Sequence, residues 1–149
     1  MNIYLDVCCL NRPFDDHTQD RIHLESEAVL TILRYCRLGK LAWVSSRIVD
    51  YEVLKTPDGD KRQKVFGFTE LKASEVEIDH EVRSRAKFLE VSGFKSLDAL
   101  HIACAEKARV EVFLTTDDQL LKMAKRHKNE IRVPVENPLK WLLKIRENT

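Results

Sequence analysis

The sequence predicts an α/β fold in which a mainly parallel sheet is covered by helices on both faces. Short apolar segments alternate along the chain with longer segments whose apolar residues recur at helical spacing. This alternation is typical of βαβ units, in which a crossover helix connects two parallel strands. The length of 149 residues suits a single domain, residues 1–149, with a core large enough to need no disulfide framework.

Five segments have the composition of strands buried in such a sheet. They lie at residues 3–6, 41–45, 76–78, 110–115 and 131–135. The third is the weakest, and the fourth, Val-Glu-Val-Phe-Leu-Thr, is the clearest. The fifth contains Pro134, which cannot donate a ladder hydrogen bond and therefore favours a strand that ends there.

Helical patterns occupy most of the remaining chain. They cover residues 22–38, 46–54, 61–71, 79–91, 97–108, 117–127 and 138–146. Gly39 follows the first of them, as is common just after a helix end. Residues 97–108 are apolar nearly all round, which indicates a buried helix. The segment between the first strand and the first helix is predicted to be a loop.

Three aspartates stand where an apolar segment meets a turn or a helix start. Asp6 and Asp117 directly follow the first and fourth strands, and Asp98 lies in the first turn of the buried helix. Ligands of open parallel sheets bind beyond the carboxyl ends of the strands, so these positions favour a shared site. Each aspartate also has an ordinary structural explanation, either in a turn or at a helix N-terminus.

Glu52 is a fourth candidate because of its helical phase. It follows Ile48 by four positions and Val49 by three, so its carboxylate shares their apolar face. Asp50 projects to the opposite side and is predicted to be solvated. A carboxylate on an apolar face needs a cation or hydrogen-bond donors, and a salt bridge to an arginine would satisfy it as well as a metal ion.

Four converging carboxylates predict a site for a hard cation. Two carboxylates 4 Å apart repel by about 4 kcal/mol at an effective dielectric constant of 20. Mg²⁺ or Mn²⁺ would relieve this repulsion, and such an ion leaves room for phosphate oxygens and a water molecule. The predicted reaction class is metal-dependent hydrolysis of a phosphodiester. The chain has no histidine cluster typical of zinc and no glycine-rich phosphate loop.

Several neighbours of these acids could support the site. His101 follows Asp98 by one helical turn, although a lone histidine there is more often a hydrogen-bonded core residue. Thr115 and Thr116 could supply a hydroxyl group at the end of the fourth strand. Asp118 either supports Asp117 or is simply exposed.

The order Asp6, Glu52, Asp98, Asp117 resembles that of PIN-domain nucleases. The resemblance rests on Leu-Asp at the first strand, Ser-Leu-Asp-Ala-Leu-His-Ile-Ala at the buried helix and Leu-Thr-Thr-Asp-Asp after the fourth strand. It implies a three-layer α/β/α sandwich and endoribonuclease activity that depends on Mg²⁺ or Mn²⁺. Small members of the family are often VapC-like toxins of type II toxin–antitoxin pairs, commonly homodimeric and inhibited by a cognate antitoxin.

The chain departs from this family directly after the first aspartate. Many members have Thr or Ser and then Asn there, whereas this chain has Val7, Cys8 and Cys9. Asn11 is one candidate for the missing support. The departure motivates an alternative function, a PIN-fold module that binds RNA or protein with weakened catalysis. A phospho-acceptor signalling domain fits less well, because Val133 stands where such a domain has a lysine.

The overall composition adds little to these predictions. The net charge of +1 means that RNA would have to bind through local patches, for which Arg12 and Arg47 near the acids are the candidates. A second basic run occupies residues 122–128, although such runs are usually solvated helix faces. The chain has neither a secretory signal nor an apolar run long enough for a membrane helix, which favours the cytoplasm.

Overall fold

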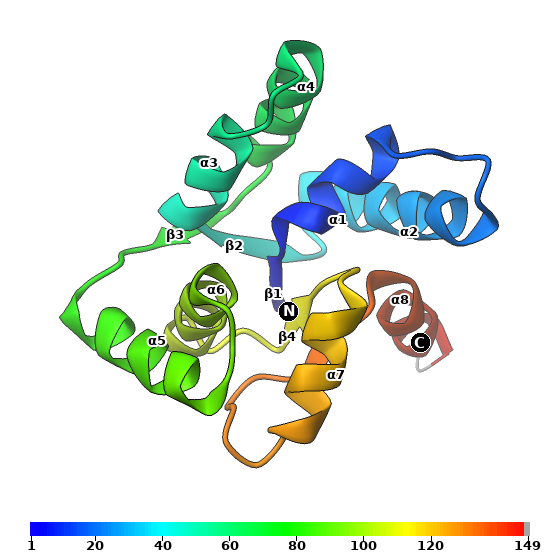
Figure 1. Cartoon of the computed structure of the whole chain (residues 1–149). Helices are drawn as coiled ribbons and strands as arrows, with labels where there is room; N and C mark the ends of the chain where they lie inside the picture. Colours follow the sequence, from blue (N-terminus) through cyan, green and yellow to red (C-terminus); the bar gives the residue numbers. More distant parts are fainter. Residues whose placement is uncertain (148–149) are drawn as a thin grey trace.

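A computed structural model describes residues 1–147 and contains a sheet of five strands that all run parallel (Figure 1). The strands are β1 (Asn2–Leu5), β2 (Ala42–Ser46), β3 (Ser74–Val76), β4 (Val112–Leu114) and β5 (Val135–Glu136). Their order across the sheet is β3-β2-β1-β4-β5, so β1 is central and β3 and β5 form the edges. The predicted fold class is confirmed.

Helices connect the strands and cover the sheet. In chain order they are α1 (Val7–Asn11), the 3-10 helix η1 (Arg12–Phe14), α2 (Asp20–Arg37), α3 (Arg47–Leu54), α4 (Gly59–Thr69), α5 (His80–Ser92), α6 (Ser96–Lys107), α7 (Asp118–Arg126) and α8 (Pro138–Glu147). The seven predicted helices correspond to α2–α8, with ends that differ by at most two residues. Gly39 and Gly93 have positive φ angles of 76° and 118°, which explains glycine beyond the ends of α2 and α5.

The prediction of a loop after the first strand was wrong. Asp6 Oδ1 accepts a hydrogen bond of 2.8 Å from the backbone N–H of Val7, and the chain continues directly into α1. This helix buries Val7, Cys9 and Leu10. Five residues are too few to display a helical period in the sequence, which is why the pattern did not reveal the helix.

The predicted last strand was also misplaced. Residues 131–134 do not belong to β5, which begins at Val135. The carbonyl of Pro134 accepts a hydrogen bond of 2.8 Å from Phe113 N. Because proline has no N–H to donate in return, the strand begins one residue later. The third strand lies at Ser74–Val76, two residues earlier than predicted.

The core forms around β1 and β4, between helices on both faces of the sheet. Ile3, Tyr4, Leu5 and Phe113 have no exposed surface. Figure 1 shows α5 and α6 packed together on one side of β1, and α2 and α8 together on the other. Because all strands are parallel, their carboxyl ends meet at one edge, where β1 leads into α1, β2 into α3 and β4 toward α7. No helix within residues 1–147 is long and apolar enough to cross a membrane.

Candidate metal centre

Asp6 is fixed at the carboxyl edge of the central strand. Its backbone N–H donates to the carbonyl of Leu114 at 2.9 Å, which continues the pairing of β1 with β4. One carboxylate oxygen, Oδ1, caps α1 through Val7 N, and the other, Oδ2, accepts a hydrogen bond of 2.8 Å from Thr115 Oγ1. The side chain is only 6% exposed. The orientation of this carboxylate is therefore set by β4 as well as by its own helix.

Cys8 supports the same carboxylate. Its thiol donates to Asp6 Oδ2 at 3.4 Å, and Sγ lies 3.2 Å from Thr115 Oγ1. The sulfur also accepts from the backbone N–H of Thr116 at 3.3 Å. Cys8 stands at the second position after Asp6, where many family members have Asn, and Val7 stands at the position of their Thr or Ser. The sequence did not identify Cys8, since its position follows from the unpredicted helix α1.

Thr115 links the carboxylate of Asp6 to the segment that carries Asp117. Its hydroxyl donates to Asp6 Oδ2 and accepts from Asp117 N at 3.1 Å. Thr115 has no exposed surface and Thr116 only 4%. Thr115 thus supports Asp6 through its hydroxyl, and Thr116 supports Cys8 through its backbone N–H.

Glu52 is held by a buried chain of hydrogen bonds. His101, which has no exposed surface, places Nε2 at 2.5 Å from Glu52 Oε1 and Nδ1 at 2.7 Å from the hydroxyl of Tyr4. That hydroxyl also lies 2.7 Å from Ser46 Oγ. Both ring nitrogens of His101 are thereby occupied. The imidazole consequently orients Glu52 and is not free to bind an ion in this arrangement.

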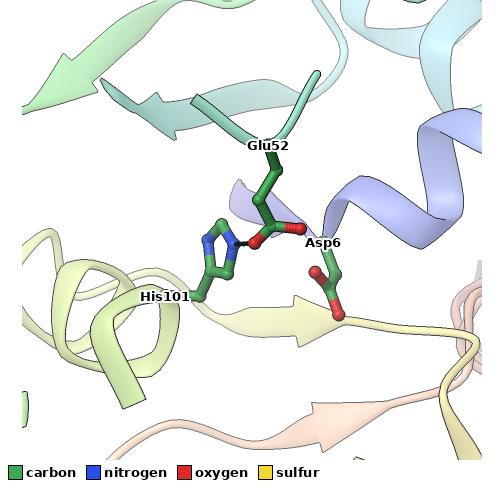
Figure 2. A group of neighbouring side chains, drawn as sticks. All are labelled: Asp6, Glu52 and His101. Carbon is green, nitrogen blue, oxygen red and sulfur yellow. Dashed lines mark hydrogen bonds and ion pairs between the residues drawn. The ribbon is translucent and has the colours of Figure 1, made fainter. Parts of the chain in front are cut away.

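Asp6, Glu52 and His101 converge from three different elements. Figure 2 shows the carboxylates of Asp6 and Glu52 turned toward the same space, with the His101 ring beside Glu52. One ligand atom from each of the three residues lies within 4.8 Å of the others. A single ion could therefore contact the carboxylates of both Asp6 and Glu52, while His101 Nε2 already binds Glu52.

Asp98 and Asp117 lie near enough to interact electrostatically with this group, but they are not part of the set whose ligand atoms lie within 4.8 Å of one another. Asp98 lies partly buried in the first turn of α6, and burial together with the negative charges of Asp6 and Asp117 raises its pKa to about 6. Burial likewise raises the pKa of Asp6, more than the nearby His101 lowers it. Asp117 caps α7 through Oδ1, which accepts from Gln119 N at 2.9 Å. The N-cap of α7 is therefore Asp117 and not Thr116, and this role uses one of the two carboxylate oxygens of Asp117.

These four acids lack the usual compensation by lysine or arginine. Within residues 1–147, no salt bridge joins Asp6, Glu52, Asp98 or Asp117 to either residue type, and His101 is the one basic partner. Burial alone would lower the pKa of His101, but its hydrogen bond to Glu52 and the charge of Asp6 outweigh burial and raise it. Oxygen ligands with uncompensated negative charge fit a hard divalent cation.

Two other predicted residues are engaged elsewhere. The Arg12 guanidinium donates to the buried carboxylate of Glu25 at 2.9 Å and to Asp15 at 3.1 Å. Asp118 is exposed and forms a two-pronged ion pair with Arg21, at 2.6 and 2.8 Å. Arg12 would have to break these ion pairs to bind substrate, and Asp118 would have to leave Arg21 to support the other acids.

Arg47 and Asn11 are further predicted residues for which the described part of the chain shows no hydrogen bond to the four acids. Arg47 is exposed at the first position of α3. Asn11 has a buried Oδ1 without a hydrogen-bond partner in the described part of the chain. Asp50 is partly exposed and lies outside the group formed by Asp6, Glu52 and His101. Burial raises its pKa, and Glu75 lies beside it as a hydrogen-bond partner.

The fold and the site together define a class of protein, an α/β protein with a cluster of carboxylates at the carboxyl ends of a parallel sheet. The profile of the PIN domain matches residues 3–126 of the chain. The chain therefore belongs to the PIN-domain family, as the sequence resemblance predicted.

Solved structures with the same fold support this assignment. FitAcB from Neisseria gonorrhoeae is 18% identical, with a TM-score of 0.59 over 91% of this chain and 97% of that one. VapBC2 from Rickettsia felis, bound to a DNA fragment from its promoter, is 14% identical, with a TM-score of 0.55 over 92% and 98%. At these identities the similarity is one of fold. No curated protein shows significant sequence similarity to the chain.

Proposed function

We propose that the protein is a metal-dependent endoribonuclease that hydrolyses RNA phosphodiesters. The observation that carries the proposal is the convergence of buried Asp6 and partly buried Glu52 within ligand distance of each other, with no lysine or arginine bound to them in residues 1–147. Holding these charges together costs free energy in the folded protein, as the raised pKa of Asp98 indicates. A divalent cation would offset that cost.

In this proposal the acids have different roles. Asp6, Asp98 and Asp117 hold Mg²⁺ or Mn²⁺, which when bound lowers the pKa of a water ligand and stabilises negative charge on the phosphate. Glu52 uses Oε1 to bond with His101, so Oε2 is the atom that accepts the proton of the attacking water. Thr115 and Cys8 hold the carboxylate of Asp6 in place.

RNA as the substrate and a toxin–antitoxin role rest on family membership and on the fold neighbours. Small single-domain members of the family are often VapC-like toxins, and VapBC2 and FitAcB share this fold, so we infer a toxin of a type II pair. The inferred partners are a cognate antitoxin and a second copy of the chain, and the inferred compartment is the cytoplasm.

The direct test is cleavage of a mixed panel of single-stranded RNA oligonucleotides with Mn²⁺, with Mg²⁺ and with EDTA. We expect cleavage with either ion, none with EDTA, and a loss of at least a hundredfold in Asp6→Asn. Asp118→Asn is the matched control, because it changes an exposed acid that is bound to Arg21, and it should retain most activity. Equal cleavage by the parent protein and Asp6→Asn would refute the proposal.

The second candidate is a PIN-fold binding module with weakened catalysis. Cys8 favours it, since a thiol is a poorer hydrogen-bond donor to Asp6 than the Thr, Ser or Asn side chains that many family members have after this aspartate. This function predicts RNA or protein binding that Mn²⁺ does not convert into turnover. Multiple-turnover cleavage of one oligonucleotide would exclude it.

A further inference from the structure

A groove lies at the β5 edge of the sheet and shares no residue with the acidic cluster. It has a volume of about 670 Å³ and runs between α7, the segment before β5, β5 itself and α8. Its apolar lining includes Leu121, Ala124, Ile131, Val133 and Val135. Ala124 and Val133 are buried, but Leu121, Ile131 and Val135 remain partly exposed, so apolar surface is accessible to a ligand here.

Cations surround this apolar floor. Lys125, Lys128, Arg132, Lys140 and Lys144 all line the groove and all are exposed. Lys144 pairs with Glu136, which is the one acid of the lining. In the described part of the chain the other four side chains form no salt bridge. The groove therefore carries an excess of positive charge on a protein whose net charge is only +1.

The chemistry of the lining favours a peptide over a nucleic acid. Single-stranded RNA is usually held by aromatic rings that stack with its bases, and the groove contains no aromatic side chain. A peptide with alternating acidic and apolar side chains would match both the rim and the floor. The outer edge of β5 also has no neighbouring strand, so the groove is not closed by the sheet.

We propose that this groove is a docking surface for an acidic, apolar segment of a partner protein. Apolar side chains of the segment pack on the floor formed by α7 and β5, and its carboxylates pair with the unpaired cations of the rim. This interaction goes beyond the proposed nuclease activity. It accounts for the basic run at residues 122–128, of which Lys125 and Lys128 face the groove.

The probe for this proposal is a 12-residue peptide in which Glu and Leu alternate, titrated into ¹⁵N-labelled protein and followed by ¹H–¹⁵N correlation spectra. We expect saturable shifts concentrated at Leu121, Ala124, Ile131, Val133 and Val135. A peptide of alternating Glu and Ser tests the apolar part, and a 12-nucleotide RNA tests the competing ligand class. Both should bind at least tenfold more weakly at these residues.

Charge reversal provides the matched test. Lys128→Glu with Lys140→Glu changes two exposed rim residues and should weaken peptide binding at least tenfold. Lys87→Glu with Lys122→Glu makes the same change in net charge on exposed residues outside the groove, and binding should change by less than threefold. Both double variants should cleave RNA like the parent protein, which separates this proposal from the nuclease function.

Three results would overturn the proposal. The first is that the Glu–Ser peptide binds as tightly as the Glu–Leu peptide, which would show that charge alone causes the binding. The second is preferential binding of the RNA at the groove residues. The third is a shift of the same signals with protein concentration in the absence of peptide, which would show that a second copy of the chain covers the groove.

Discussion

Two buried carboxylates of this protein, Glu25 and Asp6, illustrate opposite uses of the same chemical group. Glu25 in α2 is 1% exposed and Asp6 is 6% exposed. Glu25 accepts from Arg12 Nε at 2.9 Å, from Arg21 Nε at 3.2 Å and from Asn137 Nδ2 at 2.5 Å. Asp6 accepts from a hydroxyl, a thiol and a backbone N–H, with no lysine or arginine.

The difference shows that burial alone does not identify a functional acid. Two guanidinium groups neutralise Glu25, so its network connects α2 to η1 and, through Asn137, to the start of α8. The charge of Asp6 stays uncompensated and is joined by Glu52 and Asp98, so it is available to an ion. Arg21 links the two regions, since it also donates to the carbonyl of Thr116 beside Asp117.

The largest expected effect is on catalysis. Asp98→Asn should lower the cleavage rate by about 10³-fold, on the order of 4 kcal/mol in the barrier, because it removes a metal-binding carboxylate. The same change should stabilise the metal-free protein, since it removes an ionised group that burial and its neighbours disfavour. Cleavage rates and urea unfolding in EDTA measure the two effects. If this variant cleaved RNA as fast as the parent protein, Asp98 would not be a metal-binding residue.

Glu25→Gln should act in the opposite direction on stability. It leaves two guanidinium groups without their buried counter-charge, and the loss of one partner from a buried pair costs about 3 kcal/mol. Urea unfolding measures this loss. Asp15→Asn is the control, because it removes the more exposed partner of Arg12 and should cost less than about 1 kcal/mol. A stable Glu25→Gln protein would show that the network is not structural.

The third prediction concerns pH and the metal-free protein. The pKa of Asp98 is about 6 in the folded protein, whereas the ordinary value for an aspartate side chain is 3.8. The folded state binds this proton more tightly, so its contribution to stability is complete below about pH 4 and is lost as the pH rises to about 6. The free energy of unfolding of the parent should therefore fall relative to Asp98→Asn in this window, by about 1–2 kcal/mol because solvent screens the partly exposed carboxylate. Parallel pH curves would contradict the assignment.

The fourth prediction tests whether Cys8 supports Asp6 through its hydrogen bond or through packing. Cys8→Ala should weaken Mn²⁺ binding about tenfold, as is common when a residue that orients a metal ligand is lost. Cys8→Ser restores a donor of similar size and should bind Mn²⁺ within threefold of the parent protein. Isothermal titration with Mn²⁺ measures both. If serine behaved like alanine, Cys8 would act through packing and not through its hydrogen bond to Asp6.

The smallest expected effect is that of Tyr4→Phe. The change removes the hydroxyl between His101 and Ser46 while keeping the ring stacked on Phe113. We expect a loss of about 1 kcal/mol in stability and a several-fold fall in cleavage rate with little change in RNA affinity. If RNA affinity fell as much as the cleavage rate, the change would have disrupted the whole site and not only the orientation of Glu52.

The sequence predicted most of the fold because its long helices and apolar strands carry clear periodicity. It failed for α1, which is too short to show a period, and for β5, where Pro134 delays the pairing. At the site, a strand end and helical phase singled out Asp6 and Glu52, which the fold brings within ligand distance of each other. They could not reveal Cys8, whose contacts depend on α1, or the pairing of Arg12 with Glu25, which are brought together only by the fold.

The most direct test of the contrast between compensated and uncompensated acids is a calorimetric titration with Mn²⁺ of the parent protein, Asp98→Asn and Glu25→Gln, at a temperature where all three are folded. We expect the affinity of Asp98→Asn for Mn²⁺ to be at least a hundredfold weaker than that of the parent. Glu25→Gln should bind Mn²⁺ within threefold of the parent despite its lower stability. Equal Mn²⁺ binding by the parent and Asp98→Asn, or loss of binding in a folded Glu25→Gln protein, would contradict this contrast.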